Sequence, residues 1–430
     1  MAASTVFAKP EQPGYGATFS LELRRVKATN DVGVMMGPIC FALLSVVVGV
    51  LGDSQYLNHA HPVGLVGDTS NKVDSIDNGL ADTDLLMAFA VFRHGDRTPD
   101  EEEMAKYPSE PDQYKEIFFP FGKKALTNAG KQRGFRVGEF LRKRYNGLIS
   151  SLYLPDEVVI RTTDYARTKM TALTALAALF PPPPAQRWNP FLNWQPVPYS
   201  TEAYNDDDLM YYYNCPRYTK LHKDTYDLPE IKETLKQYKK VFEYLTEKTG
   251  ADINTPEDAF FLDNLFQTLA NVGVKPPAWA DEVMPKIKEL TKLEYATEYY
   301  NNELIRLSSG VLLAEVVNAT NAAIKGATEQ PKLRLYSAHE NNVAGFMAAI
   351  GVFKPHQPSY GSLISLELRK KRSTGQYGVA AVYARTPEKP EEILPIDGCG
   401  GQLFCDYDRF ITLSQDHILA KSEFKKRCTL

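Results

Sequence analysis

The sequence predicts a three-layer α/β domain that carries a helical insertion. Short apolar runs alternate with helical segments both early and late in the chain, and this alternation is typical of α/β folds. Between these two parts, residues from about 200 to 325 have a mostly helical pattern. The chain has 430 residues, of which 43% are hydrophobic, so it is long enough to bury a large core. In open α/β sheets the ligand site lies at the carboxyl ends of the strands.

The strands are predicted from short apolar runs that end in polar turns. The run over residues 85–92 is apolar at every position, which is typical of a central strand in a parallel sheet. It stops abruptly at Arg93, where the pattern can no longer be that of a strand interior. The other predicted strands are Val158–Ile160, Leu333–Tyr336, Leu363–Leu368 and Val379–Tyr383.

The helices are predicted from apolar spacing and from the residues that stop them. One helix follows Thr127, and a second, rich in Ala and Leu, covers 168–180 before four prolines at 181–184 end it. A late helix is expected from Asn342. The expected apolar faces are Phe135, Phe140 and Leu141 in the first helix, and Phe242, Tyr244, Leu245, Phe260, Phe261, Leu265 and Leu269 in two helices of the insertion.

The N-terminal region predicts export into the secretory pathway. Basic residues precede an uncharged run over 32–52, and this run of roughly 21 residues is just long enough to span a bilayer. Its apolar centre is shorter and has the length of a signal peptide, so a cleaved signal and a retained signal-anchor both remain open. The product would be secreted, lysosomal or membrane-anchored, with its folded domain outside the cytosol. Residues 1–31 are then a tail, 53–83 a linker and 84–430 the folded domain.

The cysteines fit an exported protein. Cys40 lies in the apolar run, which leaves an even number after the export segment. Cys399 and Cys405 flank a glycine-rich turn and are expected to close a small loop, and Cys215 and Cys428 are then left for each other. The alternative is four free buried thiols.

Charge and composition limit the partners. The formal net charge is -4 and the pI about 6.1, so nucleic acid is not an expected partner, and an anionic substrate must be held by local charge. No cysteine and histidine spacing indicates zinc, and no metal or cofactor is expected. Asn318 begins an Asn-Ala-Thr sequon, a predicted glycosylation site.

The segment 93–99, Arg-His-Gly-Asp-Arg-Thr-Pro, carries the strongest chemical signal. Two arginines flank His94 in a turn after a buried strand, and a guanidinium matches phosphate oxygens in a bidentate fashion. Their charges lower the pKa of the imidazole and keep it neutral, so it is available as a nucleophile. The alternative is a basic surface turn with a chance histidine, but this pattern should arise by chance in only about one in ten thousand such chains.

The segment resembles the signature of the histidine acid phosphatases, and the resemblance covers about residues 84–430. It is greatest for the prostatic and lysosomal acid phosphatase branch of that family. The further segments that carry it are Leu126-Thr127, Gly130, Gly138, 141–145 (Leu-Arg-Lys-Arg-Tyr), 161–168 (Arg-Thr-Thr-Asp-Tyr-Ala-Arg-Thr), 188–190, 194–196, 214–217 and 336–340 (Tyr-Ser-Ala-His-Glu).

This resemblance implies a phosphoglycerate-mutase-like fold with a helical cap, the same two disulfides, no metal, and in many relatives a homodimer. It also implies an acid phosphatase that hydrolyses phosphate monoesters, either small molecules or phosphoproteins. His94 would become a phosphohistidine, and Glu340 would protonate the leaving alcohol. The groups that would bind the phosphate oxygens are Arg93, Arg97, Arg167 and His339.

Some assignments have alternatives within the sequence. Many members of the family have Asp where this chain has Glu340, which leaves open which acid donates the proton. Other activities considered are a phytase or inositol-polyphosphate phosphatase, and a catalytically inactive, membrane-tethered binding protein. The alternative proton donors to Glu340 are Asp96 and Glu103, and the alternative phosphate-binding residues to Arg167 are Arg161 and Lys169. The remaining histidines lie in no motif: His59, His61, His222, His356 and His417.

Overall fold

A computed structural model describes residues 79–108, 117–327 and 329–429. The predicted tail, the apolar run at 32–52 and most of the predicted linker lie outside these residues. Every predicted strand is present and extends slightly beyond its expected bounds. The strands are β1 (Thr83–Arg93), β2 (Val158–Thr162), β3 (Ser200–Thr201), β4 (Leu333–Ala338), β5 (Leu363–Lys371), β6 (Tyr377–Ala384), β7 (Glu392–Leu394) and β8 (Cys405–Asp406).

The helices follow the predicted order, with the late helix beginning two residues before Asn342. They are α1 (Glu101–Met104), α2 (Asn128–Tyr145), α3 (Ala166–Leu179), α4 (Pro216–Thr225), α5 (Pro229–Lys236), α6 (Lys239–Thr249), α7 (Pro256–Asn271), α8 (Ala278–Glu298), α9 (Asn302–Ile324), α10 (Glu340–Ala349), α11 (Tyr407–Ser414) and α12 (Lys421–Arg427).

The sheet is mixed, with the strand order β3-β2-β4-β1-β5-β6-β7. β1 is central, as predicted, and pairs parallel with β4. Its other neighbour, β5, is antiparallel, so the expectation of a fully parallel environment was wrong. The apolar run correctly indicated that both faces of β1 are buried. Burial on both faces is possible beside a parallel or an antiparallel strand, so the run could not determine the direction of β5.

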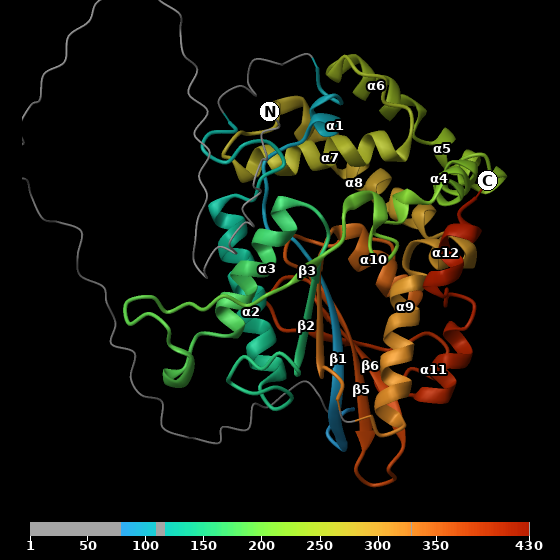
Figure 1. Cartoon of the computed structure of the whole chain (residues 1–430). Helices are drawn as coiled ribbons and strands as arrows, with labels where there is room; N and C mark the ends of the chain where they lie inside the picture. The colour runs from blue at the N-terminus through green and yellow to red at the C-terminus, as the bar shows by residue number, and fades with distance from the viewer. Residues whose placement is uncertain (1–78, 109–116, 328, 430) are drawn as a thin grey trace, which may run out of the picture. The chain divides into compact units, whose positions relative to one another are not determined.

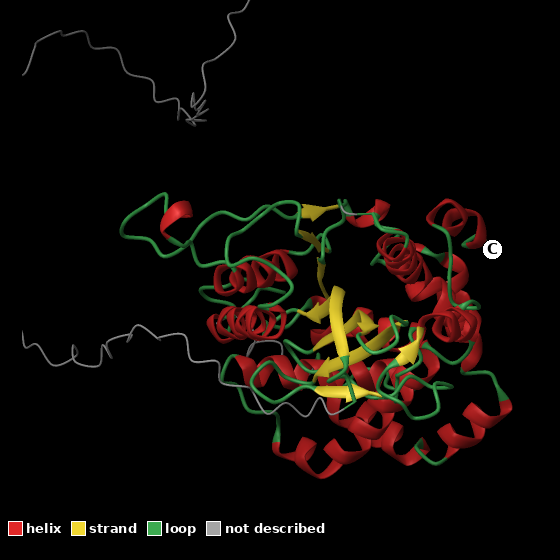
Figure 2. Cartoon of the chain, turned by 90° about the horizontal axis from the view of Figure 1, so that it is seen from below, coloured by secondary structure: helices red, strands yellow, loops and turns green. Residues whose placement is uncertain are grey.

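The two faces of β1 pack against different helices, which gives three layers (Figures 1 and 2). Ala88, Ala90 and Phe92 share a core with residues of α2 and α3. The alternate residues, among them Phe89 and Val91, share a second core with residues of α9, α10 and α11. Side chains along a strand point alternately to opposite faces, so one apolar run supplies both cores. The predicted fold class is confirmed.

Glycines determine which side of α2 faces α3. A Cβ on Gly134 would lie 2.2 Å from the Thr174 hydroxyl, and one on Gly138 would lie 2.0 Å from the Ala175 carbonyl oxygen. The two helices therefore approach closely along the glycine face. Phe135, predicted on the apolar side, is 43% exposed, because the glycine face of α2 packs against α3 instead. The prediction used the spacing of apolar side chains and so did not include the glycines.

The helical block expected over 200–325 is divided between two places. α6, α7 and α8 pack around a core of their own and form the cap above the sheet (Figure 1). Tyr107, from the segment after α1, also packs into this cap core. α9 instead packs against the sheet, so the cap helices end at Glu298. Among the described residues, α9 is also the one helix with the length and composition to cross a membrane, but most of it is buried inside the protein.

Both predicted disulfides are present. Cys215–Cys428 joins the start of α4 to the end of α12 across 213 residues of sequence. Cys399–Cys405 closes the short glycine-containing loop before β8. Asn318, the predicted glycosylation site, is exposed on α9.

A buried carboxyl group ends α8. Glu298 is 5% exposed; its Oε1 accepts a hydrogen bond from the Tyr213 hydroxyl, and its Oε2 has no hydrogen-bond partner. Burial, followed by the charge of Glu294 one turn earlier, raises the pKa of Glu298 to about 8. Although burial lowers the pKa of His222 beside it, the hydrogen bond and charge of Glu294 raise that pKa overall.

We expect this cluster to make the protein less stable as the pH rises. A pKa that is higher in the folded than in the unfolded state gives stability at low pH, which is lost as the pH rises from about 4.5 towards 8. Glu298→Gln should therefore reduce the fall in unfolding free energy between pH 5 and pH 8 by a few kcal/mol, because a tenfold change in a protonation equilibrium corresponds to about 1.4 kcal/mol. Denaturant titrations measure this, with the exposed Glu282→Gln on the same helix as control. Equal pH slopes in wild type and Glu298→Gln would contradict the expectation.

Candidate active site

The candidate residues follow the carboxyl ends of neighbouring strands. His94 comes directly after β1, and His339 comes directly after β4 and caps α10. Arg167 lies in the first turn of α3, which follows β2. β2, β4 and β1 are parallel neighbours, so their carboxyl ends lie along one edge of the sheet. That edge brings together side chains that are up to 246 positions apart in the sequence, from Arg93 to His339.

The hydrogen bonds of His94 define its tautomer. Nδ1 lies 2.8 Å from the carbonyl oxygen of Gly95 and must donate to it, since a carbonyl only accepts. Nε2 therefore carries the lone pair, and it accepts from Arg167 Nε at 3.2 Å. A Cβ on Gly95 would lie 2.1 Å from the carbonyl oxygen of Gly130, so glycine is required for this close approach.

The surroundings of His94 keep the imidazole neutral. The side chain is buried, and burial is the largest cause of a pKa well below the ordinary value of 6.5. The charges of Arg167, His339, Arg93 and Arg97 lower it further. Nε2 is thus an unprotonated nucleophile even in mildly acidic solution.

Arg93 is fully buried beside His94. Its Nη1 donates to the Pro358 carbonyl at 2.7 Å, and its guanidinium stacks on the Tyr360 ring at 3.9 Å. Its Nε lies 3.0 Å from a carboxylate oxygen of Glu340. Neither Nε nor Nη2 of Arg93 makes a hydrogen bond of good geometry. Buried polar groups are normally satisfied, so Nη2 is available to a bound anion, while Nε faces the Glu340 carboxylate.

Arg97 presents a further free donor. Both of its terminal nitrogens bind the carboxylate of Glu103, which is 1% exposed. Its Nε is buried and has no hydrogen-bond partner. Arg93 Nη2 and Arg97 Nε thus contribute N–H groups without a protein partner next to the nucleophile, as a phosphate-binding site requires.

Arg167 joins the two histidines. Its Nη2 lies 3.4 Å from Nδ1 of His339 and donates to it, so Nε2–H of His339 donates to the Thr163 hydroxyl at 3.0 Å. Burial and the charge of Arg97 lower the pKa of Arg167 to about 10, so the guanidinium stays charged at neutral and acidic pH. Of the alternatives to Arg167, Arg161 pairs with Glu202 and Asp207, and Lys169 pairs with Asp164.

Glu340 is the acid that faces the cavity next to His339. Burial raises the pKa of Glu340, but the charges of Arg93 and Arg97 outweigh burial, and the pKa is lower than usual overall. The carboxyl group is therefore ionised in the free protein at neutral pH. The two alternative acids are engaged elsewhere. Asp96 accepts from Arg133 Nε at 2.6 Å, and Glu103 holds Arg97.

A cavity of about 920 Å³ opens beside these groups. Arg97, Arg167, His339 and Glu340 lie in its wall, and the cap and the segment before α4 complete it. Tyrosines also line this wall; one lies in the 161–168 segment and the others lie in the segment before α4, and none of them was assigned to the site from the sequence. They are Tyr165, Tyr204, Tyr211, Tyr212 and Tyr213.

The sequence matches the histidine phosphatase superfamily (branch 2) over residues 84–383. The chain belongs to this family. It is 34% identical to human prostatic acid phosphatase over 353 residues, covering 79% of this chain and 86% of the relative. It is 31% identical to human lysosomal acid phosphatase, with 79% of each chain covered, and 31% identical to honeybee venom acid phosphatase, with 77% and 85% covered.

Solved structures show the same fold. Hafnia alvei phytase in complex with myo-inositol hexakis sulphate has a TM-score of 0.63 at 16% identity, covering 81% of this chain and 99% of the phytase. The tartrate complex of that phytase gives 0.59 at 15% identity, with the same coverage. The predicted family and the predicted enzyme class, an acid phosphatase, are confirmed. The predicted export into the secretory pathway agrees with lysosomal and venom relatives.

The site of this histidine phosphatase is unsuited to a metal ion. His94, His339 and Glu340 present ligand atoms within 4.8 Å of one another, which is close enough to consider a metal. The buried guanidinium groups around them would repel a cation, and the same charges favour a phosphate. The remaining histidines of the described part hydrogen-bond outside the site: His222 to Thr297, His356 to Tyr383 and His417 to Ala349.

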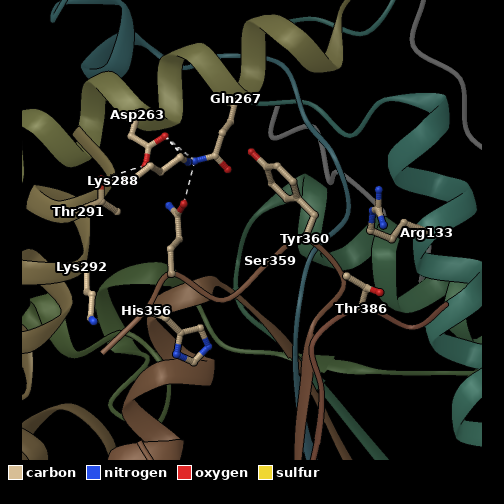
Figure 3. A pocket seen from close by; sticks show the side chains of 11 residues that line it. Arg133, Asp263, Gln267, Lys288, Thr291, Lys292, His356, Ser359, Tyr360 and Thr386 are labelled. Carbon is tan, nitrogen blue, oxygen red and sulfur yellow. Dashed lines mark hydrogen bonds and ion pairs between the residues drawn. The ribbon is translucent and has the colours of Figure 1, made fainter. Parts of the chain in front are cut away.

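A second cavity, of about 500 Å³, lies between the cap and the segment before β5 (Figure 3). Lys288 and Gln267 both bind Asp263, and Gln267 also donates to Gln357. These side chains satisfy one another, and none of the predicted site residues lines this cavity. Tyr360 connects the two places, because it lines this cavity and its ring stacks on Arg93.

Proposed function

We propose that this histidine phosphatase hydrolyses phosphate monoesters through a covalent phosphohistidine on His94. The observation that carries the proposal is the group of buried, unpaired arginine N–H donors beside an unprotonated Nε2. A phosphoryl group would satisfy these donors, whose desolvation is otherwise uncompensated. Its dianionic charge would also offset the cluster of Arg93, Arg97 and Arg167.

The reaction takes two steps. Nε2 of His94 attacks phosphorus, the P–N bond forms, and the P–O bond to the alcohol breaks as Glu340 gives a proton to the leaving oxygen. Arg93, Arg97 and Arg167 hold the equatorial oxygens and stabilise their charge in the transition state. His339 would join them by shifting its Nε2–H hydrogen bond from the Thr163 hydroxyl to a phosphate oxygen. A water then attacks the phosphorus and gives its proton to Glu340; the new P–O bond forms as the P–N bond to Nε2 breaks, and orthophosphate leaves.

The pKa directions favour acidic pH. Glu340 must be protonated to act in the first step, and the arginines lower its pKa in the free protein. A bound phosphoryl group would counter those charges and raise the pKa of Glu340 again. His94 has a pKa well below 6.5 and remains a nucleophile in this range. Activity should therefore decrease as the pH rises above the pKa of Glu340 in the complex.

The charge around the cavity favours substrates with one phosphate over inositol polyphosphates. Asp100, Glu102, Asp164 and Glu257 line its wall in addition to Glu340. The two lysines of the wall are already paired, Lys106 with Asp258 and Lys124 with Glu101. Further phosphate groups would meet net negative charge, so small phosphomonoesters or phosphoproteins fit better than phytate.

The arrangement also speaks against an inactive binding protein. The tautomer of His94 and the unpartnered Nη2 of Arg93 support a catalytic site rather than a binding site that has lost its chemistry. We propose that the catalytic part lies outside the cytosol, where its two disulfides would be stable, whether the protein is secreted, lysosomal or anchored through residues 32–52.

The test compares two substrates over a pH range. The full chain from an oxidising host should release phosphate from a simple aryl phosphate at pH 4–6, with at least about tenfold less activity at pH 8. A chelator should not change the rate, and phytate should be hydrolysed at least about tenfold more slowly. A chelator-sensitive enzyme would contradict the proposed mechanism, and faster hydrolysis of phytate would instead support the inositol-polyphosphate alternative.

A further inference from the structure

The side chain of Glu103 is held in place by its own short helix. Asp100 caps α1 and accepts a hydrogen bond from the backbone N–H of Glu103 at 3.1 Å. In return, Oε2 of Glu103 accepts from the backbone N–H of Asp100, also at 3.1 Å. This reciprocal capping box turns the Glu103 side chain back towards the segment that carries the phosphate-binding arginines.

Glu103 fixes the orientation of Arg97. Its Oε2 accepts from Arg97 Nη1 at 2.9 Å, and its Oε1 accepts from Arg97 Nη2. Both partners are more than nine-tenths buried, so the ion pair is shielded from water. The carboxylate takes one N–H of each terminal nitrogen, and Nη1 also donates to the Thr98 carbonyl at 3.1 Å. The edge of Arg97 that remains free therefore carries Nε–H and the second N–H of Nη2.

Without this carboxylate, the arginines would repel one another. Burial and then the charge of Arg97 lower the pKa of Arg167, as expected for two like charges that line one cavity. Of the carboxylates that the structure describes, Glu103 is the one that binds Arg97 on both terminal nitrogens. Glu340, the other buried acid of the site, pairs with Arg93 instead.

We propose that Glu103 is a positioning residue that holds Arg97 edge-on, with Nε–H directed to the phosphoryl group. This inference rests on the proposed function, since it assigns Arg97 to the phosphate. It also separates Glu103 from proton transfer, because both of its oxygens are engaged by donors and it acts through Arg97 rather than on the leaving alcohol.

Glu103→Ala should weaken phosphate binding while leaving the chemical step nearly intact. We expect KM for an aryl phosphate and the Kd of inorganic phosphate, measured by calorimetry, each to rise about tenfold, because one charge-assisted hydrogen bond is lost. The value of kcat should change by less than about threefold. An alkyl phosphate should be affected to the same degree, since a positioning residue does not depend on the leaving group.

A double-mutant cycle tests whether Glu103 acts through Arg97. In an Arg97→Gln background, Glu103→Ala should raise the phosphate Kd no further, because the group that it positions is already gone. Glu103→Gln keeps the side-chain length and one acceptor oxygen, so it should fold normally and give an intermediate loss. Glu282→Gln, at an exposed position of α8 that lines no cavity described above, is the matched control and should leave phosphate binding unchanged.

Three results would overturn the inference. These are unchanged phosphate affinity in Glu103→Ala, fully additive effects of the two substitutions, and a larger loss with alkyl than with aryl phosphates, which would make Glu103 a proton donor. The calorimetric Kd does not require turnover. A wild type that binds phosphate with this coupling but has no activity would therefore refute the proposed function and leave the positioning role intact.

Discussion

Replacing His94 with alanine should lower kcat/KM for an aryl phosphate by about 10⁴-fold or more, as removal of a catalytic nucleophile does in other covalent enzymes. Nε2 is the unprotonated nitrogen that faces the arginine donors, and alanine offers no atom that can form the P–N bond. Phosphate-release assays across pH 4–8 measure the loss.

A second measurement separates lost chemistry from lost structure. His94→Ala keeps Arg93, Arg97 and Arg167, so inorganic phosphate should still bind to it. Acid-labile, base-stable labelling from radioactive substrate should appear in the wild type and be absent from the variant. His417→Ala is the matched control, because its ring hydrogen-bonds the carbonyl of Ala349, at the opposite end of α10 from the site. Retention of most of the activity in His94→Ala would show that the nucleophile is misassigned.

The local parts of the site could be predicted from the sequence. His94 and Arg93 lie in one turn, and His339 and Glu340 in another, so each pair is brought together by adjacent positions in the chain. The strand before each turn was visible as an apolar run, and parallel strands place the turns at the same edge. Family resemblance added Arg167, which the structure joins to both histidines.

The parts that depend on packing could not be predicted. The sequence contains several acids after the first motif, and only the capping box of α1 shows that Glu103 turns back to Arg97. The stacking of Tyr360 on Arg93 joins positions 267 residues apart. α9 has a helical pattern like those of α6, α7 and α8. Its place against the sheet, rather than in the cap, follows from tertiary contacts that the hydrophobic periodicity does not encode.

Replacing Glu340 with glutamine should give a loss that depends on the leaving group. Glutamine has nearly the same shape but neither donates nor accepts the proton that the reaction moves. We expect kcat for an alkyl phosphate to fall by about 10²- to 10⁴-fold, the usual contribution of a general acid. Phosphoryl transfer from an activated aryl phosphate needs little protonation and should fall by less than about tenfold.

The same substitution should change which step limits turnover. Glu340 also takes the proton from the attacking water, so Glu340→Gln should accumulate the phosphohistidine when the leaving group is good. Rapid mixing would then show a burst of aryl alcohol equal to the enzyme concentration, followed by slow turnover with little dependence on pH. Asp96→Asn provides the comparison, because Asp96 is bound to Arg133 and should show no leaving-group dependence. If Asp96→Asn gave the burst and Glu340→Gln did not, the acid would be Asp96, and the ion pair of Glu340 with Arg93 would serve only to orient the arginine.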